Sequence, residues 1–209
     1  MAVSGPNLRL CSSNMIEICS PNSDWPKQFA AAAAALRAIL GDDALAIEHI
    51  GSTAVPGLGA KDVIDIQVSV RALDPAILET LNNQGYPART DYRDVFAGIP
   101  AESPELSKYF AREPAGERRL HIHIRECGRF NHRFALLFRD FLRADPETCR
   151  QYEELKRQAA KAYRDDIDGY LAIKTPVFRI IYELAERWAA DINWSEENCL
   201  SGDPPWTIH

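Results

Sequence analysis

Alternation of apolar and polar residues predicts two β-strands in the middle of the chain. In residues 63–70 every second position is Ile or Val, and the positions between are mostly polar and include Asp65. Residues 119–125 alternate in the same way, with His121 and His123 among the polar positions. Successive side chains of a strand point to opposite faces of a sheet. Each strand is therefore expected to bury an aliphatic face and to present a polar one.

Start and stop signals predict the helices. Asp24, followed by Trp-Pro, predicts a helix start with the Asp24 carboxylate as cap, and Gly41 ends that helix. A second helix is predicted over residues 75–83, after Asp74. Residues 132–190 read almost entirely as helix, with new starts predicted at Asp145-Pro146 and Thr175-Pro176.

These elements predict one α+β domain. Residues 44–50 form a further strand, and the irregular residues 86–117 are expected to hold one or two short strands. Short strands followed by mostly helix from about residue 130 indicate an α+β fold with a helical C-terminal part. The domain is predicted to span residues 16–194, between a loose lead-in (1–15) and a C-terminal tail (195–209).

Composition excludes several classes of protein. The chain has 209 residues, of which 46% are hydrophobic, and its glycine and proline contents are ordinary. The longest apolar run, residues 29–36, is well short of the roughly 20 residues that cross a bilayer. Five cysteines without a C-x-x-C pair match neither a disulfide framework nor a zinc site. We expect a soluble, cytoplasmic protein with no membrane partner and no signal peptide.

Charge is distributed unevenly along the chain. The net charge is −6, yet residues 108–143 contain nine basic and four acidic residues. A basic segment in an acidic protein favours binding of a phosphorylated ligand at one place. The alternative is that these arginines pair with acidic neighbours on a solvated face.

A Gly-Ser turn and a spaced carboxylate suggest phosphate chemistry. Gly51-Ser52 follows one predicted strand, and Asp65 lies on the next. Backbone N–H groups and a hydroxyl in such a turn can hold phosphate oxygens, and the layout resembles the nucleotidyltransferase superfamily. In that superfamily a second acidic residue two positions on helps to hold a divalent metal, whereas here that position is Gln67. Asp65 is a candidate ligand for Mg²⁺ or Mn²⁺, but a two-metal arrangement is in doubt.

His121 and His123 share one strand face with two arginines. They could ligate a metal, act as acid and base, or bind phosphate as imidazolium; alternatively, they are partly exposed strand histidines. Glu48 and His49 precede the Gly-Ser turn and must point to opposite sides of their strand. Lys61 could neutralise a phosphate or a carboxylate, or be a solvated lysine. Further candidates recur at helical spacing, where a packed helix face is the alternative: Arg139, Arg143, Lys156, Tyr170 and Lys174.

Several segments together resemble the GrpB family. Residues 47–58 read IEHIGSTAVPGL and are followed by Ala60-Lys61 and by VIDI at 63–66. Further matches cover nearly all of residues 16–194: Trp25-Pro26 with Phe29, His121-Ile122-His123, residues 138–143 (FRDFLR), Tyr152, Leu155-Lys156, Tyr170 and Lys174. Two positions depart from the pattern, because Asp62 stands where many relatives have Pro and Gln67 replaces the superfamily's second carboxylate.

The resemblance implies a nucleotidyltransferase-like fold, with a small mixed β-sheet flanked by helices. It also implies site residues: Asp65, His121, His123 and Glu48 as catalytic candidates, and His49, Gly51, Ser52, Lys61, Arg139, Arg143, Lys156, Tyr170 and Lys174 as substrate-binding candidates. The expected function is a transferase acting on a phosphorylated, nucleotide-linked or tRNA-borne substrate. One alternative is synthesis of arginine-containing cyclic dipeptides from aminoacyl-tRNA, in which the basic segment would meet tRNA. Another is a non-catalytic nucleotide-binding or auxiliary module, since some relatives are fused to a dephospho-CoA kinase.

Overall fold

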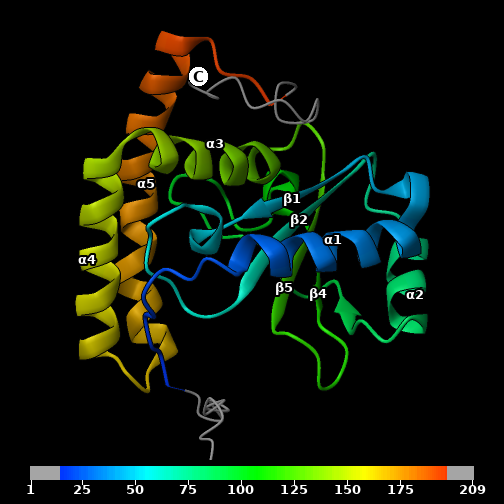
Figure 1. Cartoon of the computed structure of the whole chain (residues 1–209). Helices are drawn as coiled ribbons and strands as arrows, with labels where there is room; N and C mark the ends of the chain where they lie inside the picture. Colours follow the sequence, from blue (N-terminus) through cyan, green and yellow to red (C-terminus); the bar gives the residue numbers. More distant parts are fainter. Residues whose placement is uncertain (1–14, 197–209) are drawn as a thin grey trace, which may run out of the picture.

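In the computed structural model, residues 15–196 are described, and within them a single five-stranded sheet lies at the centre (Figure 1). Its strand order is β1-β2-β5-β4-β3, and β2 and β5 are parallel whereas the other neighbours are antiparallel. The strands are β1 (Ala46–Ile50), β2 (Ile64–Val70), β3 (Ala88–Arg89), β4 (Tyr109–Arg112) and β5 (Leu120–Glu126). The prediction of an α+β fold with a small mixed sheet is confirmed.

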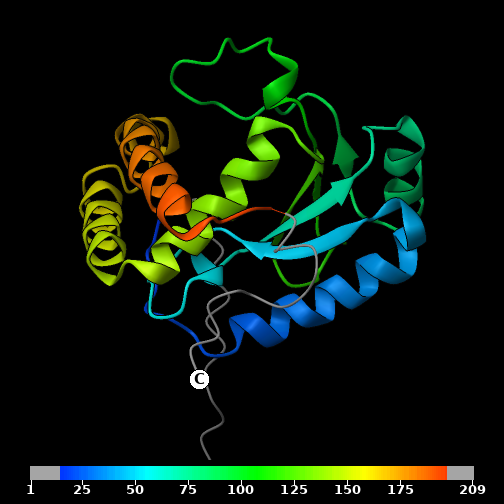
Figure 2. The same ribbon diagram turned by 90° about the horizontal axis from the view of Figure 1, so that it is seen from above.

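The two alternating strands lie side by side in the middle of this sheet. The aliphatic positions of β2 and β5 are buried together in one hydrophobic core. Helices α1 (Trp25–Leu40) and α2 (Pro75–Asn83) cover that face, while α3 (Phe130–Ala144) covers the face that carries Asp65 and the histidines (Figure 2). The predicted division of each strand into an apolar and a polar face is confirmed.

The helices predicted after Asp24 and Asp74 both begin where the sequence indicates, but only Asp74 caps its helix. Asp74 accepts a hydrogen bond from Ala76 N (2.8 Å) and caps α2 as its type predicts. Asp24 makes no side-chain cap bond, because its backbone is already helical (φ −86°, ψ −14°). The chain before α1 is held instead by Asn22, whose Oδ1 accepts from Asp24 N (2.9 Å). The prediction of a capping carboxylate at Asp24 was therefore wrong.

The helical C-terminal part begins at α3 and continues as α4 (Pro146–Ala162) and α5 (Ile167–Ile192), which pack against each other and beside the sheet (Figure 1). The predicted start at Asp145-Pro146 is confirmed, with Asp145 capping Thr148 N. The predicted start at Thr175-Pro176 was wrong, because Pro176 lies inside α5, which begins after its cap Asp166. Packing of α5 on α3 and α4 outweighs the cost of a proline inside a helix.

The C-terminal end of the described region packs against the rest of the fold. Trp194 is buried, and its indole Nε1 donates to Asp140 Oδ2 (3.2 Å). The predicted lead-in and tail fall almost wholly on residues 1–14 and 197–209, outside the described residues.

Across residues 15–196, no helix combines the length and the apolar character needed to span a bilayer. Short 3-10 turns complete the described elements: η1 (Gly41–Asp43), η2 (Ser52–Ala54) and η3 (Pro104–Leu106).

Candidate functional site

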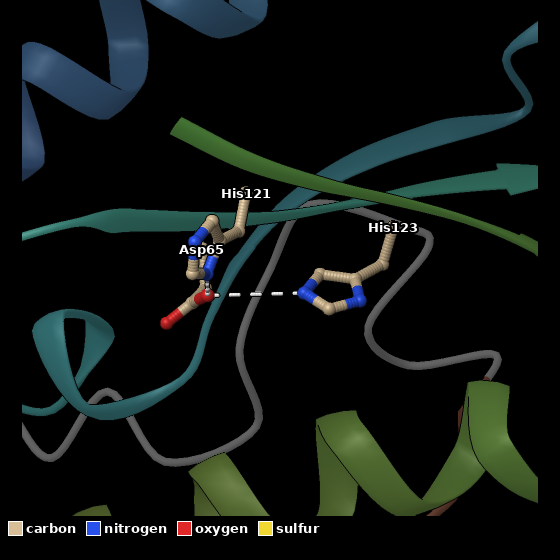
Figure 3. Close-up of side chains that lie close together, drawn as sticks. All are labelled: Asp65, His121 and His123. Carbon is tan, nitrogen blue, oxygen red and sulfur yellow. Dashed lines mark hydrogen bonds and ion pairs between the residues drawn. The ribbon is translucent and has the colours of Figure 1, made fainter. Parts of the chain in front are cut away.

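Parallel pairing of β2 and β5 brings Asp65 and the two histidines together (Figure 3). Asp65 and His121 are register partners, and His123 lies two positions further along β5 on the same face. Asp65 Oδ1 is 3.1 Å from His121 Nδ1 and 3.7 Å from His123 Nε2. One carboxylate oxygen therefore faces both imidazoles, and all three side chains are only partly exposed.

The Gly-Ser turn closes over Asp65. The last residue of β1, Ile50, pairs with Asp65, so the chain turns directly beside the carboxylate. Gly51 has φ +70°, and a Cβ built there would lie 2.5 Å from Asp65 Oδ2. Only glycine combines that backbone conformation with so close an approach. The predicted turn is therefore a wall of the site, and Ser52 opens η2 immediately after it.

Asp65 is held as a carboxylate. Burial raises the pKa of Asp65, but hydrogen bonds from His121 and His123 oppose this effect and bring the pKa below its usual range. A carboxylate that accepts from one imidazole and faces a second at 3.7 Å remains ionised at neutral pH. Because a carboxylate only accepts hydrogen bonds, Asp65 in turn orients the imidazoles of His121 and His123 so that an N–H of each ring faces it.

The second nitrogen of His123 faces two cations. Its Nδ1 lies 3.1 Å from Lys108 Nζ and 3.5 Å from Arg125 Nη2. Burial, with the charges of Lys108 and Arg125, lowers the pKa of His123 to about 3, so this ring is neutral. Both cations are fixed by Asp94, which accepts from Lys108 Nζ (2.6 Å) and Arg125 Nε (2.9 Å).

This network around Asp94 was not predicted from the sequence. Arg125 carried a signal, since it alternates with His121 and His123 on one strand face. Asp94 lies in the irregular segment between β3 and η3, where no periodicity indicates a partner 31 residues away. Lys108 comes directly before β4 and reaches His123 only because β4 pairs with β5.

Three lysines gather on one side of Asp65 around a cavity of about 50 Å³. Lys61 precedes β2, Lys156 comes from α4 and Lys174 from α5. The remaining lining residues are Ile18, Ser52, Thr53, Ala60, Val63, Asp65, His121 and Tyr170. Six predicted site residues thus meet here with Asp65: Ser52, Lys61, His121, Lys156, Tyr170 and Lys174.

The lysines of this cavity, which we call the lysine cavity, have few acceptors of their own. Lys156 donates to Ser52 Oγ (2.9 Å) and Gly59 O (2.6 Å). In residues 15–196, Lys61 and Lys174 have no hydrogen-bond or ion-pair partner. Instead, both ammonium groups lie over the Tyr170 ring, at 5.3 Å and 5.9 Å from its centroid. Aromatic faces tolerate a cation but do not neutralise it.

Burial in the lysine cavity makes the charged form of these lysines energetically unfavourable. Burial, with repulsion from Lys174, lowers the pKa of Lys156 to about 7. Burial, with repulsion from Lys61, lowers the pKa of Lys174 to about 8. Burial raises the pKa of Tyr170 to about 12, so its hydroxyl stays protonated. Crowded cations with depressed pKa values are typical of a site that gains from an anionic ligand.

A second, apolar cavity of about 210 Å³ lies on the other side of Asp65. It shares Asp65 with the first cavity and is also lined by Gly51 and His123, whereas its far wall is aromatic. That wall is formed by Phe96, Phe130, Phe134 and Phe178. Asn131 also lines this aromatic cavity, and its buried Oδ1 has no hydrogen-bond partner among the described residues. Composition alone did not reveal this cavity, because its rings come from three separate segments.

Other predicted site residues lie elsewhere. His49 is on the opposite sheet face, where its ring stacks on Phe29 (4.7 Å) and its Nε2 contacts Thr53 Oγ1 (3.0 Å). Glu48 is buried 3.9 Å from Arg139 and lines neither cavity. Burial raises the pKa of Glu48 against the opposing charge of Arg139. The predicted division of Glu48 and His49 between opposite sides of the strand is confirmed.

Arg139 and Arg143 hold the backbone around the turn. Arg139 Nη1 donates to His49 O (3.0 Å), and Arg143 Nη2 donates to Ala54 O (2.7 Å). Both guanidinium groups also bond Asp140, which is fully buried. The fold therefore places these arginines behind the Gly-Ser turn, where they position it. Neither arginine lines the lysine cavity.

Much of the basic segment is paired within the fold. Lys108 and Arg125 bond Asp94, Arg129 bonds Glu105, and further partners of this segment are Asp62, Glu113, Glu126, Asp140 and Glu186. These bonds correspond to the pairing alternative considered for residues 108–143. The lysines of the cavity all lie outside that segment.

Distance alone makes Asp65, His121 and His123 a set that could hold a metal ion, since their ligand atoms lie within 4.8 Å of one another. Their chemistry fits Mg²⁺ poorly, because Mg²⁺ demands octahedral oxygen ligands and two of these donors are imidazoles. Gln67 Oε1 adds no ligand, since it accepts from Arg125 (2.7 Å). Histidine ligands also normally donate their other N–H to an acceptor, whereas His123 faces cations there. The predicted Mg²⁺ or Mn²⁺ at Asp65 therefore has little support from its neighbours.

Comparison with known proteins finds related sequences and similar solved structures over most of the chain. A family model described as GrpB protein matches residues 15–184. The dephospho-CoA kinase of Mycolicibacterium paratuberculosis is 36% identical over 196 residues, which cover 86% of this chain and 48% of that protein. The chain thus spans about half the length of the first curated relatives it matches. The crystal structure of the conserved protein GrpB from Enterococcus faecalis matches with a TM-score of 0.67 and 30% identity, covering 82% of this chain and 99% of that one. Cid1 in complex with its short product ApU matches with a TM-score of 0.46 and 16% identity, over 68% of this chain and 42% of that one.

Proposed function

The chain belongs to the GrpB protein family, and from this premise we propose that it is a transferase that holds its substrate by a phosphate group. The substrate class is a phosphorylated or nucleotide-linked compound. The phosphate binds in the lysine cavity, and the transferred group lies next to Asp65 and His121.

One observation carries this proposal: the convergence of Lys61, Lys156 and Lys174 beside the Gly-Ser turn. Three ammonium groups in a small, half-buried space repel one another unless an anion lies between them. Lys61 and Lys174 lie against aromatic rings and have no hydrogen-bond or ion-pair partner among the described residues. Asp65 attracts both only through a longer-range Coulomb interaction. Phosphate oxygens would supply the missing acceptors, and they could also accept from the N–H groups that a Gly-Ser turn offers to an anion.

The aromatic cavity supports a substrate with two chemically different ends. A planar or apolar group could pack among Phe96, Phe130 and Phe134, while its N–H groups find an acceptor in Asn131 Oδ1. Because Asp65 borders both cavities, a compound that spans them places its reactive centre at the carboxylate. A nucleotide is one compound with this distribution of charge and ring.

The transfer itself needs a proton acceptor. An acceptor hydroxyl or amine forms a bond to the transferred phosphorus or acyl carbon and loses its proton to a base at Asp65 or His121. The bond to the leaving group breaks, and its electron pair departs with that group. Lysine N–H groups stabilise the oxygens on which negative charge accumulates.

The alternatives based on tRNA and on a non-catalytic module stay predictions. Arginines of the basic segment have carboxylate partners in the described part of the chain, so they add little to the case for a tRNA surface. Glu48, one of the catalytic candidates, is buried next to Arg139.

Thermal unfolding tests the proposal. Pyrophosphate and the four common nucleoside triphosphates, each at 1 mM in EDTA, are added singly to the wild-type protein. At least one should raise the Tm, because a ligand that binds only the folded state stabilises it. Lys174→Met should abolish the increase. The matched control Lys27→Met, at an exposed position on α1, should retain it. No increase with any probe, or equal loss in both variants, would contradict phosphate binding in this cavity.

A further inference from the structure

The two histidines beside Asp65 differ in what their second ring nitrogen faces. His123 Nδ1 lies within hydrogen-bond range of Lys108 Nζ and Arg125 Nη2, both of which only donate. Its Nδ1 must therefore carry the lone pair, and the single proton of the neutral ring is on Nε2. That proton points to Asp65 Oδ1, 3.7 Å away (Figure 3).

His121 has the opposite arrangement. Its Nδ1 lies 3.1 Å from the same oxygen of Asp65, and a carboxylate only accepts. The proton is consequently on Nδ1, which leaves the lone pair on Nε2. Within residues 15–196 this nitrogen has no hydrogen-bond partner, and the His121 ring lines the lysine cavity.

We infer that His121 is the catalytic base of the site, with Asp65 and His123 as its positioning residues and the lysines as the charge-neutralising groups. The inference rests on the proposed function for the location of the substrate. His121 and His123, which the alternating sequence pattern does not distinguish, therefore have different roles. Ammonium groups also replace the divalent ion expected from the superfamily layout.

The same contacts explain why an ion does not suit this trio. A metal bound to His123 Nε2 needs the lone pair on that atom, which moves the ring proton to Nδ1. There it would point at Lys108 and Arg125, both fixed by Asp94. Metal-binding histidines have an acceptor at that position. His123 instead directs its Nε2–H at Asp65 Oδ1, 3.7 Å away, and so helps to keep the carboxylate in place.

Proton abstraction by His121 and transfer of the group require no metal ion. The acceptor X–H approaches the transferred group in the lysine cavity, and His121 Nε2 takes its proton as the new bond to X forms. The bond to the leaving group breaks, and its electron pair leaves with that group. The imidazolium formed on His121 is stabilised by Asp65 and then returns its proton to the leaving group or to water.

Nuclear magnetic resonance of ¹⁵N-labelled histidine tests the inference without any substrate. Long-range ¹H–¹⁵N correlations distinguish the tautomers, and His121→Gln and His123→Gln assign the two rings. We expect Nδ1–H at His121 and Nε2–H at His123 in EDTA, with no change when one equivalent of Zn²⁺ or excess Mg²⁺ is added. The other tautomer at either ring, or a shift of both rings with Zn²⁺, would overturn the inference.

Two variants separate a positioning role from a merely structural one. Asp65→Asn presents an amide N–H as well as an oxygen, so His121 should lose its exclusive Nδ1–H form. In His123→Gln the side-chain amide can still donate to Asp65, so His121 should keep that form. Retention of the form in Asp65→Asn would contradict the role given to Asp65.

The same experiments distinguish this inference from the proposed function. His121→Gln should retain the pyrophosphate-dependent rise in Tm, because the lysines bind the anion. If the rise persists in His121→Gln but the tautomers are reversed, the inference fails and phosphate binding stands. If the tautomers are as expected but wild-type protein shows no rise with any phosphate probe, the proposed function fails.

Discussion

The basic residues of this protein fall into two groups with different neighbours. Arginines of residues 108–143 bond carboxylates, as Arg139 and Arg143 do with Asp140 and Arg133 does with Glu186. Lys61 and Lys174 of the lysine cavity face the Tyr170 ring instead. Most arginines of the first group have a carboxylate partner, whereas Lys61 and Lys174 have no hydrogen-bond or ion-pair partner among the described residues. Charge count along the sequence does not separate the two groups, because it does not show which charges are already neutralised.

The largest expected effect comes from breaking the first group. Asp140→Ala leaves two guanidinium groups and the Trp194 indole without their shared acceptor, so the free energy of unfolding should fall by about 3–5 kcal/mol. Urea denaturation measures the change. Glu147→Ala, which removes a carboxylate paired with Arg150 at the surface, should change little. A loss below about 1 kcal/mol for Asp140→Ala would show that the buried pairs do not hold the helical part together.

The second-largest effect is expected in the lysine cavity. Lys174→Met should weaken pyrophosphate binding about 10- to 100-fold, because charged hydrogen bonds contribute roughly 1.5–3 kcal/mol. Its stability should not fall, since removing a buried, repelled charge costs nothing. Isothermal titration calorimetry measures the affinity for pyrophosphate, and urea denaturation measures the free energy of unfolding. Arg118→Met, at a residue paired with Asp62, provides the comparison and should keep its affinity within about threefold.

A pH effect of intermediate size follows from Lys156. Burial, with repulsion from Lys174, lowers its pKa from 10.5 to about 7, so between these values the folded protein binds fewer protons than the unfolded chain. The contribution of Lys156 to stability therefore rises with pH across this window. Affinity for pyrophosphate changes in the opposite direction and should fall from pH 7 to pH 9, at most about tenfold per pH unit. Lys156→Met should weaken both dependences relative to wild type, and identical pH profiles would refute the role of this amine.

The smallest effect is expected at His49. This histidine belongs to the family segment, yet it lies on the opposite face of the sheet from Asp65. His49→Gln should change pyrophosphate affinity by less than about twofold, because His49 does not itself line the lysine cavity. The measurement is the same calorimetric titration on folded protein. A loss comparable to that of Lys174→Met would mean that the phosphate lies nearer to α1 than the lysine cavity.

Local patterns predicted much of the fold. Alternation placed Asp65 on one face of β2 and both histidines on one face of β5, because strand periodicity depends only on the neighbouring residues. Asp-Pro pairs likewise marked the starts of α2 and α4. The same local signal failed at Pro176, where the surrounding helices hold α5 continuous through the proline.

The site was predictable only where each residue carried its own signal. Lys61, Lys156 and Lys174 were candidates through the family segments, but their convergence depends on how α4 and α5 are placed relative to Lys61, which precedes β2. Asp94 and the four phenylalanines of the aromatic cavity had no signal at all. Their roles arise from contacts between residues far apart in the chain, such as Asp94 with Arg125, which spacing does not encode.

The most direct test of the central claim is the position of a bound phosphate analogue. Tungstate is a tetrahedral oxyanion, and its metal centre can be located in a crystal by anomalous scattering. Soaked at low millimolar concentration, it should give one strong peak between Lys61, Lys156 and Lys174, next to Ser52. A peak at another place in the protein, or none in crystals whose lysine cavity is open to solvent, would contradict the account.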